Sequence, residues 1–349
     1  MHHSFYINKQ MMTFDQERIH IYNQYRDLID GKHPSHTDYI IDLFLFQYKY
    51  NAIYQEYVRN LGINIKDVTN IDKIPFLPIS AFKHHEVKTG DFVAEDLFLS
   101  SGTTSTVIRS KHFVRDLHHY LQNTENIWST YFQHVSEYCV LALLPGYLER
   151  EGSSLISMVQ HFVQLSKYPE SGFYLRDHKA LYDKLLHNKS NNIPTVLFGV
   201  TYALLDFVAA YEISFPELIV IETGGMKGQR KEMTKTELHD ALKPGFGVNH
   251  IYSEYGMTEL LSQAYSIEGI LFKTNPCMDI IIHQVNDPLT PEKLGKPGII
   301  SVIDLANIDS CAFIQTEDMG MLHEDRCFEI IGRMDASDLR GCNLMVQEM

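Results

Sequence analysis

The sequence predicts an α/β fold with a layered core and a smaller β-rich subdomain at its C-terminal end. In the middle of the chain, short apolar runs alternate with longer amphipathic stretches, which is typical of a mostly parallel sheet covered by helices. After residue 278 the apolar runs are separated only by turns rich in Pro, Gly and Asp. We therefore expect a helical region at 1–75, an α/β core at 76–275 and a β-rich subdomain with a tail at 276–349.

The first region is expected to be helical, because apolar residues recur at helical spacing over 19–29 and again over 40–53. Pro75 and Pro78 then favour an extended segment and end the helices. We expect core strands at 97–99, 138–144, 195–198, 218–221 and 249–252. We expect core helices at 112–134, 153–166, 179–186, 201–211 and 230–243. The C-terminal subdomain adds strands at 280–283, 299–304, 312–315 and 328–331.

Composition narrows the class of protein. The 349 residues include 30 Lys and Arg against 44 Asp and Glu, a net charge of −14, which argues against a nucleic-acid partner. No apolar run is long enough to span a membrane, and no secretory signal is visible at the N-terminus. Five cysteines without a CxxC pair indicate free thiols, so we expect a cytoplasmic protein.

Two motifs follow predicted core strands. SSGTTS at 100–105 combines hydroxyls with Gly102, and such a loop can wrap a phosphate with its backbone N–H groups. The alternative is an ordinary Ser/Thr/Gly surface loop. YGMTE at 255–259 offers a ring at Tyr255, a tight turn at Gly256, and oxygen ligands for magnesium at Thr258 and Glu259. The alternative is a glycine turn followed by a helix whose first turn holds Thr258 and Glu259.

Two further motifs lie in the C-terminal subdomain. TED at 316–318 follows a predicted strand, where a carboxylate such as Asp318 can bind both hydroxyls of a ribose. Turn chemistry explains an aspartate at that place equally well. GRMDASDLRG at 332–341 is an Arg–Asp turn that begins with Arg333, and it could also be a charged surface loop. Each motif is weak alone, whereas the four in this order are specific.

Together the motifs resemble the adenylate-forming superfamily of acyl-CoA ligases, adenylation domains and luciferases. The resemblance covers 100–341 and implies the N-terminal domain of that fold, with ATP and Mg²⁺ bound. GGMKG at 224–228 falls where the superfamily places a loop beside adenine. The resemblance implies the following nucleotide-site residues: Ser100, Ser101, Gly102, Thr103, Thr104, Gly224, Gly225, Tyr255, Gly256, Thr258 and Asp318. It also implies Glu259 as the magnesium ligand and Arg333 beside ribose or phosphate.

The sequence departs from the superfamily pattern in three ways. The usual Pro-Lys of the phosphate loop is absent, and Arg109 or Lys111 could supply that cation. Glu317 stands where the superfamily usually has glycine. The chain ends at Met349, so we expect it to lack the mobile C-terminal domain.

One subfamily resembles this shortened form, the LuxE-type acyl-protein synthetases related to phenylacetate-CoA ligase. The segment PFLPISAFK at 75–83 and the placement of Cys342 after the GRMDASDLRG motif match that subfamily. The resemblance implies that a fatty acid is activated as acyl-AMP and then loaded onto Cys342, whose thiolate is a suitable nucleophile. The alternative for Cys342 is a stray free cysteine in a tail.

The sequence therefore predicts an ATP-dependent acid–thiol ligase with a carboxylic acid substrate and, further on, an acyl-accepting protein. A ligase that uses free coenzyme A, and a binding protein on a degenerate ligase fold, remain as alternatives. The histidines at 84–85, 112 and 118–119 lack a complete set of ligands at zinc-like spacing, so no metal cluster is expected there.

Overall fold

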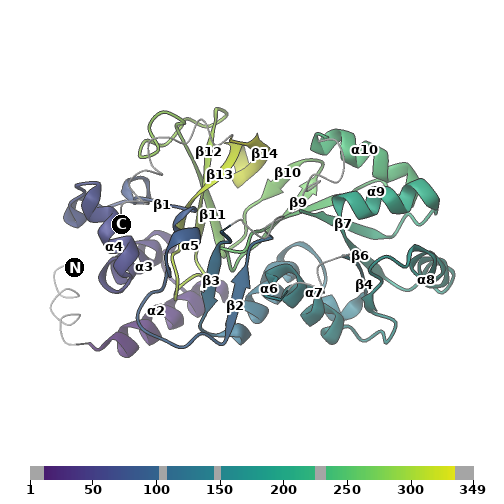
Figure 1. The fold of residues 1–349 in the computed structure, drawn as a ribbon, viewed down its shortest axis with the longest axis horizontal. Helices are drawn as coiled ribbons and strands as arrows, with labels where there is room; N and C mark the ends of the chain where they lie inside the picture. Colours follow the sequence, from purple (N-terminus) through teal and green to yellow (C-terminus); the bar gives the residue numbers. More distant parts are fainter. Residues whose placement is uncertain (1–11, 102–107, 145–150, 225–232, 335–349) are drawn as a thin grey trace.

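A computed structural model describes residues 12–101, 108–144, 151–224 and 233–334. One large mixed sheet runs through the molecule in the strand order β11-β12-β13-β14-β10-β9-β8-β7-β6-β4-β5, and β1 pairs with β13 (Figure 1). Two further strands, β2 and β3, form a separate hairpin. The sheet thus carries the mostly parallel part predicted for the core and the antiparallel strands predicted for the C-terminal subdomain.

The parallel part of the sheet comprises β4 to β8, whose neighbouring strands pair in parallel. These strands are β4 (Cys139–Leu143), β5 (Gly172–Phe173), β6 (Thr195–Val200), β7 (Ile219–Thr223) and β8 (Tyr252–Tyr255). The three central strands β4, β6 and β7 are buried along nearly their whole length because helices cover both faces of the sheet. We predicted a strand at 249–252, whereas β8 begins three residues later, at Tyr252. The YGMTE motif therefore begins inside β8, at Tyr255, rather than after the strand.

Five helices cover the two faces of the parallel part. They are α6 (Leu117–Tyr131), α7 (Ser154–Leu165), α8 (His178–Ser190), α9 (Thr201–Ala210) and α10 (Lys235–Phe246). Trp128 of α6 and Phe162 of α7 pack on Phe198 of β6, with ring centroids 5.8 and 6.0 Å away. On the opposite face Phe207 of α9 stacks on Phe246 of α10 at 5.5 Å. This arrangement confirms the expected layers.

The predicted helix at 112–134 is wrong at its start. Lys111–Val114 forms β3, which pairs antiparallel with β2 (Asp96–Leu99), and α6 begins only at Leu117. The Asp116 side chain accepts a hydrogen bond from the backbone N–H of His119 and caps the helix. The apolar residues at 113 and 114 fit the helical spacing as well as a short apolar strand, so the sequence pattern alone could not separate the strand from the helix.

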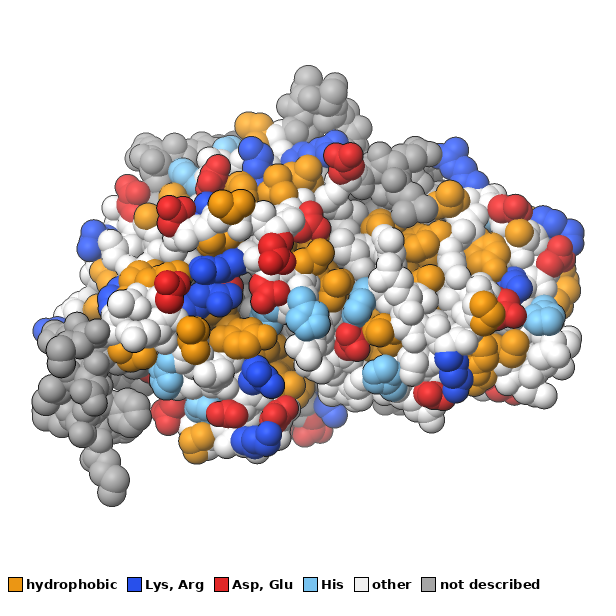
Figure 2. Space-filling model, turned by 90° about the horizontal axis from the view of Figure 1, so that it is seen from below, with side chains coloured by type: hydrophobic (Ala, Val, Ile, Leu, Met, Phe, Trp, Pro, Cys, Tyr) orange, Lys and Arg blue, Asp and Glu red, His pale blue; other side chains and the backbone are white. Residues whose placement is uncertain are grey.

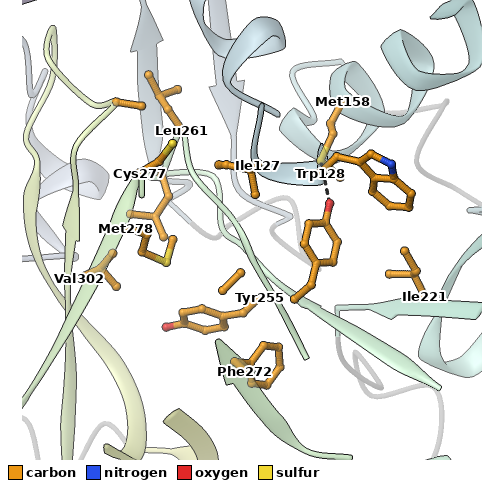
Figure 3. Packing of buried hydrophobic residues seen from close by; sticks show 14 of the residues in the cluster. Ile127, Trp128, Met158, Ile221, Tyr255, Leu261, Phe272, Cys277, Met278 and Val302 are labelled. Carbon is orange, nitrogen blue, oxygen red and sulfur yellow. Dashed lines mark hydrogen bonds between the residues drawn. The ribbon is translucent and has the colours of Figure 1, made fainter. Parts of the chain in front are cut away.

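Antiparallel strands continue the sheet beyond β8. They are β9 (Ala264–Glu268), β10 (Leu271–Lys273), β11 (Met278–His283), β12 (Pro297–Asp304), β13 (Phe313–Leu322) and β14 (Cys327–Arg333). The sequence did not predict β9 and β10. It also ended β13 at residue 315, whereas the strand runs to Leu322 and so contains the TED motif. In Figure 3 the labelled core residues Tyr255, Phe272 and Met278 lie close together in this part of the molecule.

The N-terminal helices are α2 (Phe14–Ile29), α3 (His36–Tyr50) and α4 (Ala52–Asn60), and two 3-10 turns follow at Ile65–Asp67 and Ile71–Lys73. The predicted helix at 40–53 is divided at Asn51, whose side chain accepts from the backbone N–H of Tyr54 and caps α4. These helices pack on the β11–β13 part of the sheet. The Tyr39 hydroxyl, for example, donates to the Leu305 carbonyl at 3.0 Å.

The Pro-containing segment is extended, as predicted, and forms β1 (Leu77–Pro78). It pairs in parallel with β13, Leu77 opposite Ile314, and a short helix α5 (Ala81–His84) follows. Two 3-10 turns at Val135–Glu137 and Glu324–Arg326 complete the elements. On the face in Figure 2 acidic and basic side chains are intermingled rather than gathered by sign. None of the helices in the described ranges has the length and apolar character needed to cross a membrane.

Candidate nucleotide and acyl-transfer site

The Ser/Thr loop begins at the tip of the β2–β3 hairpin. The Ser100 N–H donates to the Ser110 carbonyl at 3.1 Å, and the Ser100 hydroxyl accepts from the Ser110 N–H at 2.9 Å. Ser101 is exposed. Gly102, Thr103 and Thr104 lie outside the described residues. Ser100 is therefore held where the hairpin turns and is partly exposed, whereas Ser101 is fully exposed.

The hairpin packs directly against the YGMTE turn. His112 of β3 is buried, and its Nδ1 lies 2.9 Å from the Thr258 carbonyl oxygen. Burial lowers the pKa of His112 to about 4, so the ring is neutral near pH 7 and its Nδ1–H donates to that carbonyl. This contact brings the first two motifs together, although they are about 150 residues apart in sequence.

The YGMTE motif forms the end of β8 and a turn, and the alternative of a helix at Thr258 and Glu259 is wrong. The turn closes with a hydrogen bond from the Leu260 N–H to the Met257 carbonyl at 3.1 Å. Asp304 at the end of β12 anchors the next residues, since its Oδ2 accepts from the N–H groups of Leu261 at 2.6 Å and Ser262 at 3.2 Å. The turn is thus fixed to the antiparallel part of the sheet.

Glu259 has only 5% of its surface exposed. Burial raises the pKa of its carboxyl, while the positive charges of Lys83 and Arg333 act in the opposite direction. The Glu259 backbone carbonyl accepts from the Asn307 side-chain amide at 2.9 Å. The carboxyl is therefore nearly closed off from solvent and feels the charge of two cationic side chains.

Asp318 lies in the middle of β13 rather than at the end of a strand. The Tyr255 hydroxyl donates to Asp318 Oδ2 at 3.1 Å, and Arg333 Nε lies 3.7 Å from Asp318 Oδ1. Burial raises the pKa of Asp318, and Arg333 opposes that shift. Arg333 is opposite Asp318 in the β13–β14 ladder, so the third and fourth motifs face each other.

Tyr255 is buried instead of presenting an open ring face. Its ring meets Phe272 at 6.0 Å and Phe328 at 5.7 Å, both at steep interplanar angles. Burial, and next the charge of Asp318, raise the pKa of Tyr255 well above its ordinary value. The phenol therefore remains protonated and can continue to donate to Asp318.

Lys83 belongs to this site, although no role was predicted for it from the sequence. Its Nζ lies 3.7 Å from Glu317 Oε1, and Arg333 Nη2 lies 3.9 Å from Glu317 Oε2. The β1–β13 pairing places Lys83 there, since the Ile79 N–H donates to the Gln315 carbonyl at 2.9 Å. The one available signal was the position of Lys83 at the end of PFLPISAFK, because no local pattern gives its partner.

Two glycines border the same region. Gly224 directly follows β7 and has φ +72°, a conformation that favours glycine, and its carbonyl accepts from the Thr201 hydroxyl at 3.1 Å. Gly225 lies outside the described residues. Gly256 is exposed, and a Cβ there would collide with the Glu254 carboxyl oxygen Oε1. Cys342 lies outside the described residues, and so does the end of GRMDASDLRG. Among the described residues no group of His, Cys, Asp and Glu could by itself hold a metal ion.

The fold is that of the adenylate-forming ligases. A 2-hydroxyisobutyryl-CoA ligase solved in complex with R3-HIB-AMP has a TM-score of 0.63 at 9% identity, covering 86% of this chain and 68% of that one. ATP-bound MatB from Rhodopseudomonas palustris has a TM-score of 0.52 at 16% identity, covering 70% of this chain. The match spans about half, 49%, of the MatB chain.

The chain belongs to the family of LuxE acyl-protein synthetases, whose family model matches residues 3–349. It is 25% identical over 333 residues to a long-chain-fatty-acid–luciferin-component ligase of Aliivibrio fischeri, covering 87% of this chain and 85% of that protein. It is 24% identical to the protein of the same name from Vibrio harveyi, with the same coverage of both chains. The chain is therefore a ligase, as the sequence predicted.

Proposed function

We propose that this chain activates a long-chain fatty acid with ATP and then transfers the acyl group to its own Cys342. The family and the names of the two bacterial relatives support the acid and the ligase activity. ATP as the nucleotide is supported by the MatB structure, which was solved with ATP bound. One observation carries the proposal: Asp318 lies in contact with Tyr255 and Arg333, and the charge of Arg333 also acts on Glu259. A single site therefore offers a carboxylate that can accept hydrogen bonds from ribose hydroxyls, together with an acidic and a basic side chain.

In this proposal the acid is the nucleophile of the first step. One of its carboxylate oxygens forms a bond to the α-phosphorus of ATP, the bond from that phosphorus to the β-phosphate oxygen breaks, and pyrophosphate leaves. In the second step the thiolate of Cys342 attacks the acyl carbon, a thioester forms and AMP leaves with the bridging oxygen. The acyl group can then pass to a further acyl-accepting protein.

We assign the ribose hydroxyls to Asp318. Its carboxylate can accept two hydrogen bonds, and Tyr255 holds it in position from the buried side. Arg333 is well exposed, with 71% of its side chain open to solvent, and can turn toward ribose or phosphate. Ser100, Ser101 and the rest of the Ser/Thr loop are assigned to phosphate, and Gly224, Gly225 and Gly256 to the surroundings of adenine.

Asp318→Ala should weaken ATP binding by about tenfold or more, because each charge-assisted hydrogen bond that is lost contributes roughly 1.5–3 kcal/mol. Isothermal titration calorimetry with ATP measures the change directly. Tyr255→Phe is the matched control, since it keeps Asp318 and removes only the hydrogen bond that orients it. The control should lose less affinity than Asp318→Ala. Equal ATP affinity in Asp318→Ala and the unchanged protein would refute the assignment of Asp318.

We assign magnesium to Glu259. Its carboxylate oxygen is a hard ligand, and the described residues form no group of three or more His, Cys, Asp or Glu that would hold a metal by itself. This fits a magnesium ion that takes most of its ligands from phosphate oxygens and water. When bound there, the ion would offset negative charge on the phosphates. Thr258 is the neighbouring oxygen donor.

Glu259→Gln should lower pyrophosphate release by about tenfold or more and raise the magnesium concentration needed for half-maximal rate. The fold should tolerate the change, because burial already favours the uncharged form of this side chain. Thermal unfolding therefore serves as the control. A well-folded variant with the magnesium dependence of the unchanged protein would contradict the assignment.

The proposed function is tested by incubating the protein with ATP, Mg²⁺ and a panel of acids. We expect pyrophosphate release with long-chain acids and, by intact-mass analysis, one added acyl group on the protein. Acylation of free coenzyme A without an added mass would identify a coenzyme A ligase instead. No pyrophosphate with any acid would favour the degenerate binding protein.

A further inference from the structure

Glu254 is an acidic side chain inside this site that no motif explains. It is the residue before Tyr255 in β8, and it is partly exposed although both neighbours, Ser253 and Tyr255, are buried. Its Oε2 accepts a hydrogen bond from the Thr223 hydroxyl, on the residue paired with it in β7. Its Oε1 lies against the exposed Gly256, where a Cβ would collide with it. The Glu254 carboxyl therefore lies at the carboxyl ends of β7 and β8, between Thr223 and Gly256.

The face of the sheet that Glu254 occupies is apolar. Parallel pairing and strand alternation put Glu254 on the same face as Thr223 and Val200, and that face is covered by α6 and α7. Met158 of α7 is buried there beside Trp128 (Figure 3), and its sulfur accepts a long contact, 3.9 Å, from the Tyr265 hydroxyl. The partly exposed Glu254 therefore lies at the end of a buried layer between the sheet and these two helices.

The nearby basic side chain of Lys235 is already paired with another carboxylate and not with Glu254. Lys235 of α10 pairs with Glu222 of β7, whose carboxylate also accepts from Ser253 at 2.5 Å and Thr201 at 3.1 Å. Strand alternation puts the Glu222 side chain on the other face of the sheet from Glu254. No described lysine or arginine forms an ion pair with Glu254.

These surroundings decide the charge on Glu254. Burial, with a further contribution from the negative charge of Glu222, raises the pKa of Glu254 to about 7, although the Thr223 hydrogen bond and Lys235 oppose the shift. The other titratable groups near it are Tyr120 of α6 and Tyr265 of β9, and burial raises both phenol pKa values, so both are neutral. Glu254 thus changes charge near neutral pH while its surroundings do not.

We propose that protonated Glu254 receives the substrate acid by donating a hydrogen bond to its carboxylate, so that ionisation of Glu254 weakens acid binding but not ATP binding. This inference rests on the proposed function and adds a specificity-determining residue to it. The proton stays on Glu254, and the substrate carboxylate remains the nucleophile. Two adjacent carboxylates in an apolar place cannot both be charged without a large cost, whereas a carboxyl and a carboxylate can share one proton.

The sign of the pH dependence follows from this arrangement. Below a pH of about 7 Glu254 is protonated and can donate, and above it the ionised group repels the substrate. If only the protonated protein binds, the dissociation constant of the acid should rise by about tenfold between pH 6 and pH 8. The substrate acid itself is ionised throughout this range, so it adds no dependence of its own.

The experiment uses octanoate, a soluble acid with the same carboxylate, in place of the long-chain substrate. Its binding is measured by calorimetry from pH 6 to pH 8, without ATP, for the unchanged protein, Glu254→Gln and Thr223→Val. Glu254→Gln keeps a donor that cannot ionise, so its octanoate affinity should be constant with pH. Thr223→Val removes a hydrogen bond that stabilises the ionised form, so its pH midpoint should move upward. ATP affinity, measured in parallel, should be the same for Glu254→Gln and the unchanged protein at each pH.

A pH-independent octanoate affinity in the unchanged protein, or the same pH dependence in Glu254→Gln, would overturn the inference. An unmoved midpoint in Thr223→Val would also count against it, because a merely structural Glu254 predicts that result. If no acid binds and no pyrophosphate is released at any pH, the proposed function itself is wrong and this inference falls with it. Acid activation with pH-independent acid binding would leave the function standing and remove only the role of Glu254.

Discussion

Cys342→Ser should abolish acyl loading of the protein while leaving pyrophosphate exchange into ATP intact. A serine hydroxyl keeps the shape of the side chain but is almost un-ionised at neutral pH, so it is a far weaker nucleophile toward the acyl-adenylate. The first step needs no thiol and should continue at the rate of the unchanged protein. Intact-mass analysis before and after hydroxylamine treatment measures loading, and isotope exchange measures the first step.

The four other cysteines provide controls for this experiment. Cys139, Cys277 and Cys311 are buried, and burial raises the pKa of the Cys277 and Cys311 thiols to about 12. Cys327 is partly exposed, so Cys327→Ser is the matched control and should load normally. A Cys342→Ser protein that is still acylated, or an acyl group mapped by peptide mass to any of these four, would show the mechanism to be wrong as stated.

Lys83→Met should reduce adenylation by roughly 100-fold, the size of effect seen when one preorganised group that stabilises developing charge is removed. Lys83 lies 3.7 Å from Glu317 and within the electrostatic reach of Glu259. We expect its ammonium to supply the cation that the Ser/Thr loop lacks. Methionine keeps the length of the side chain without the charge, so a rate of pyrophosphate release measured at saturating ATP isolates the electrostatic loss.

Arg109→Met and Lys111→Met are the matched controls for Lys83, because the sequence offered these residues for the same role. Lys111 is exposed at the start of β3, at the end of the hairpin that carries the loop, where it is paired with Leu99. We expect less than about a fivefold loss in either control, as for a charge well screened by water. If Arg109→Met or Lys111→Met greatly lowers the rate of pyrophosphate release while Lys83→Met is normally active, the missing cation is Arg109 or Lys111 and not Lys83.

The sequence predicted the layers of the fold because strand–helix alternation is a local signal repeated many times. The prediction of individual elements was wrong where one segment fits both a helix and a strand, or where a strand is stabilised by pairing with residues far away in the sequence. Phe113 and Val114 fit both a helix and a strand, and the antiparallel β3–β2 pairing decided for the strand. The short strands β9 and β10 contain polar residues such as Ser266 and Lys273, and their pairing with each other and with β8 and β14 could not be read from the local pattern.

The candidate site was predictable residue by residue only where a motif carried it. Asp318, Glu259 and Arg333 came from such motifs, and their roles remain proposals. The hydrogen bond between Tyr255 and Asp318 joins two motifs 63 residues apart, and no pattern in either motif gives it. Glu254 had no motif at all, since its environment is made by α6, β7 and β9 together.

The pairing of β1 with β13 has a consequence for how the protein is made. Leu77 must find Ile314, at the far end of the chain, and closing so long a loop is slow because its entropy is lost before the contacts form. At a synthesis rate of about 5–20 residues per second, β1 waits on the ribosome for many seconds before β13 exists. Lys83 therefore cannot reach Glu317 until synthesis has passed residue 317, so this contact of the site can form only after strands β4 to β8 have been made.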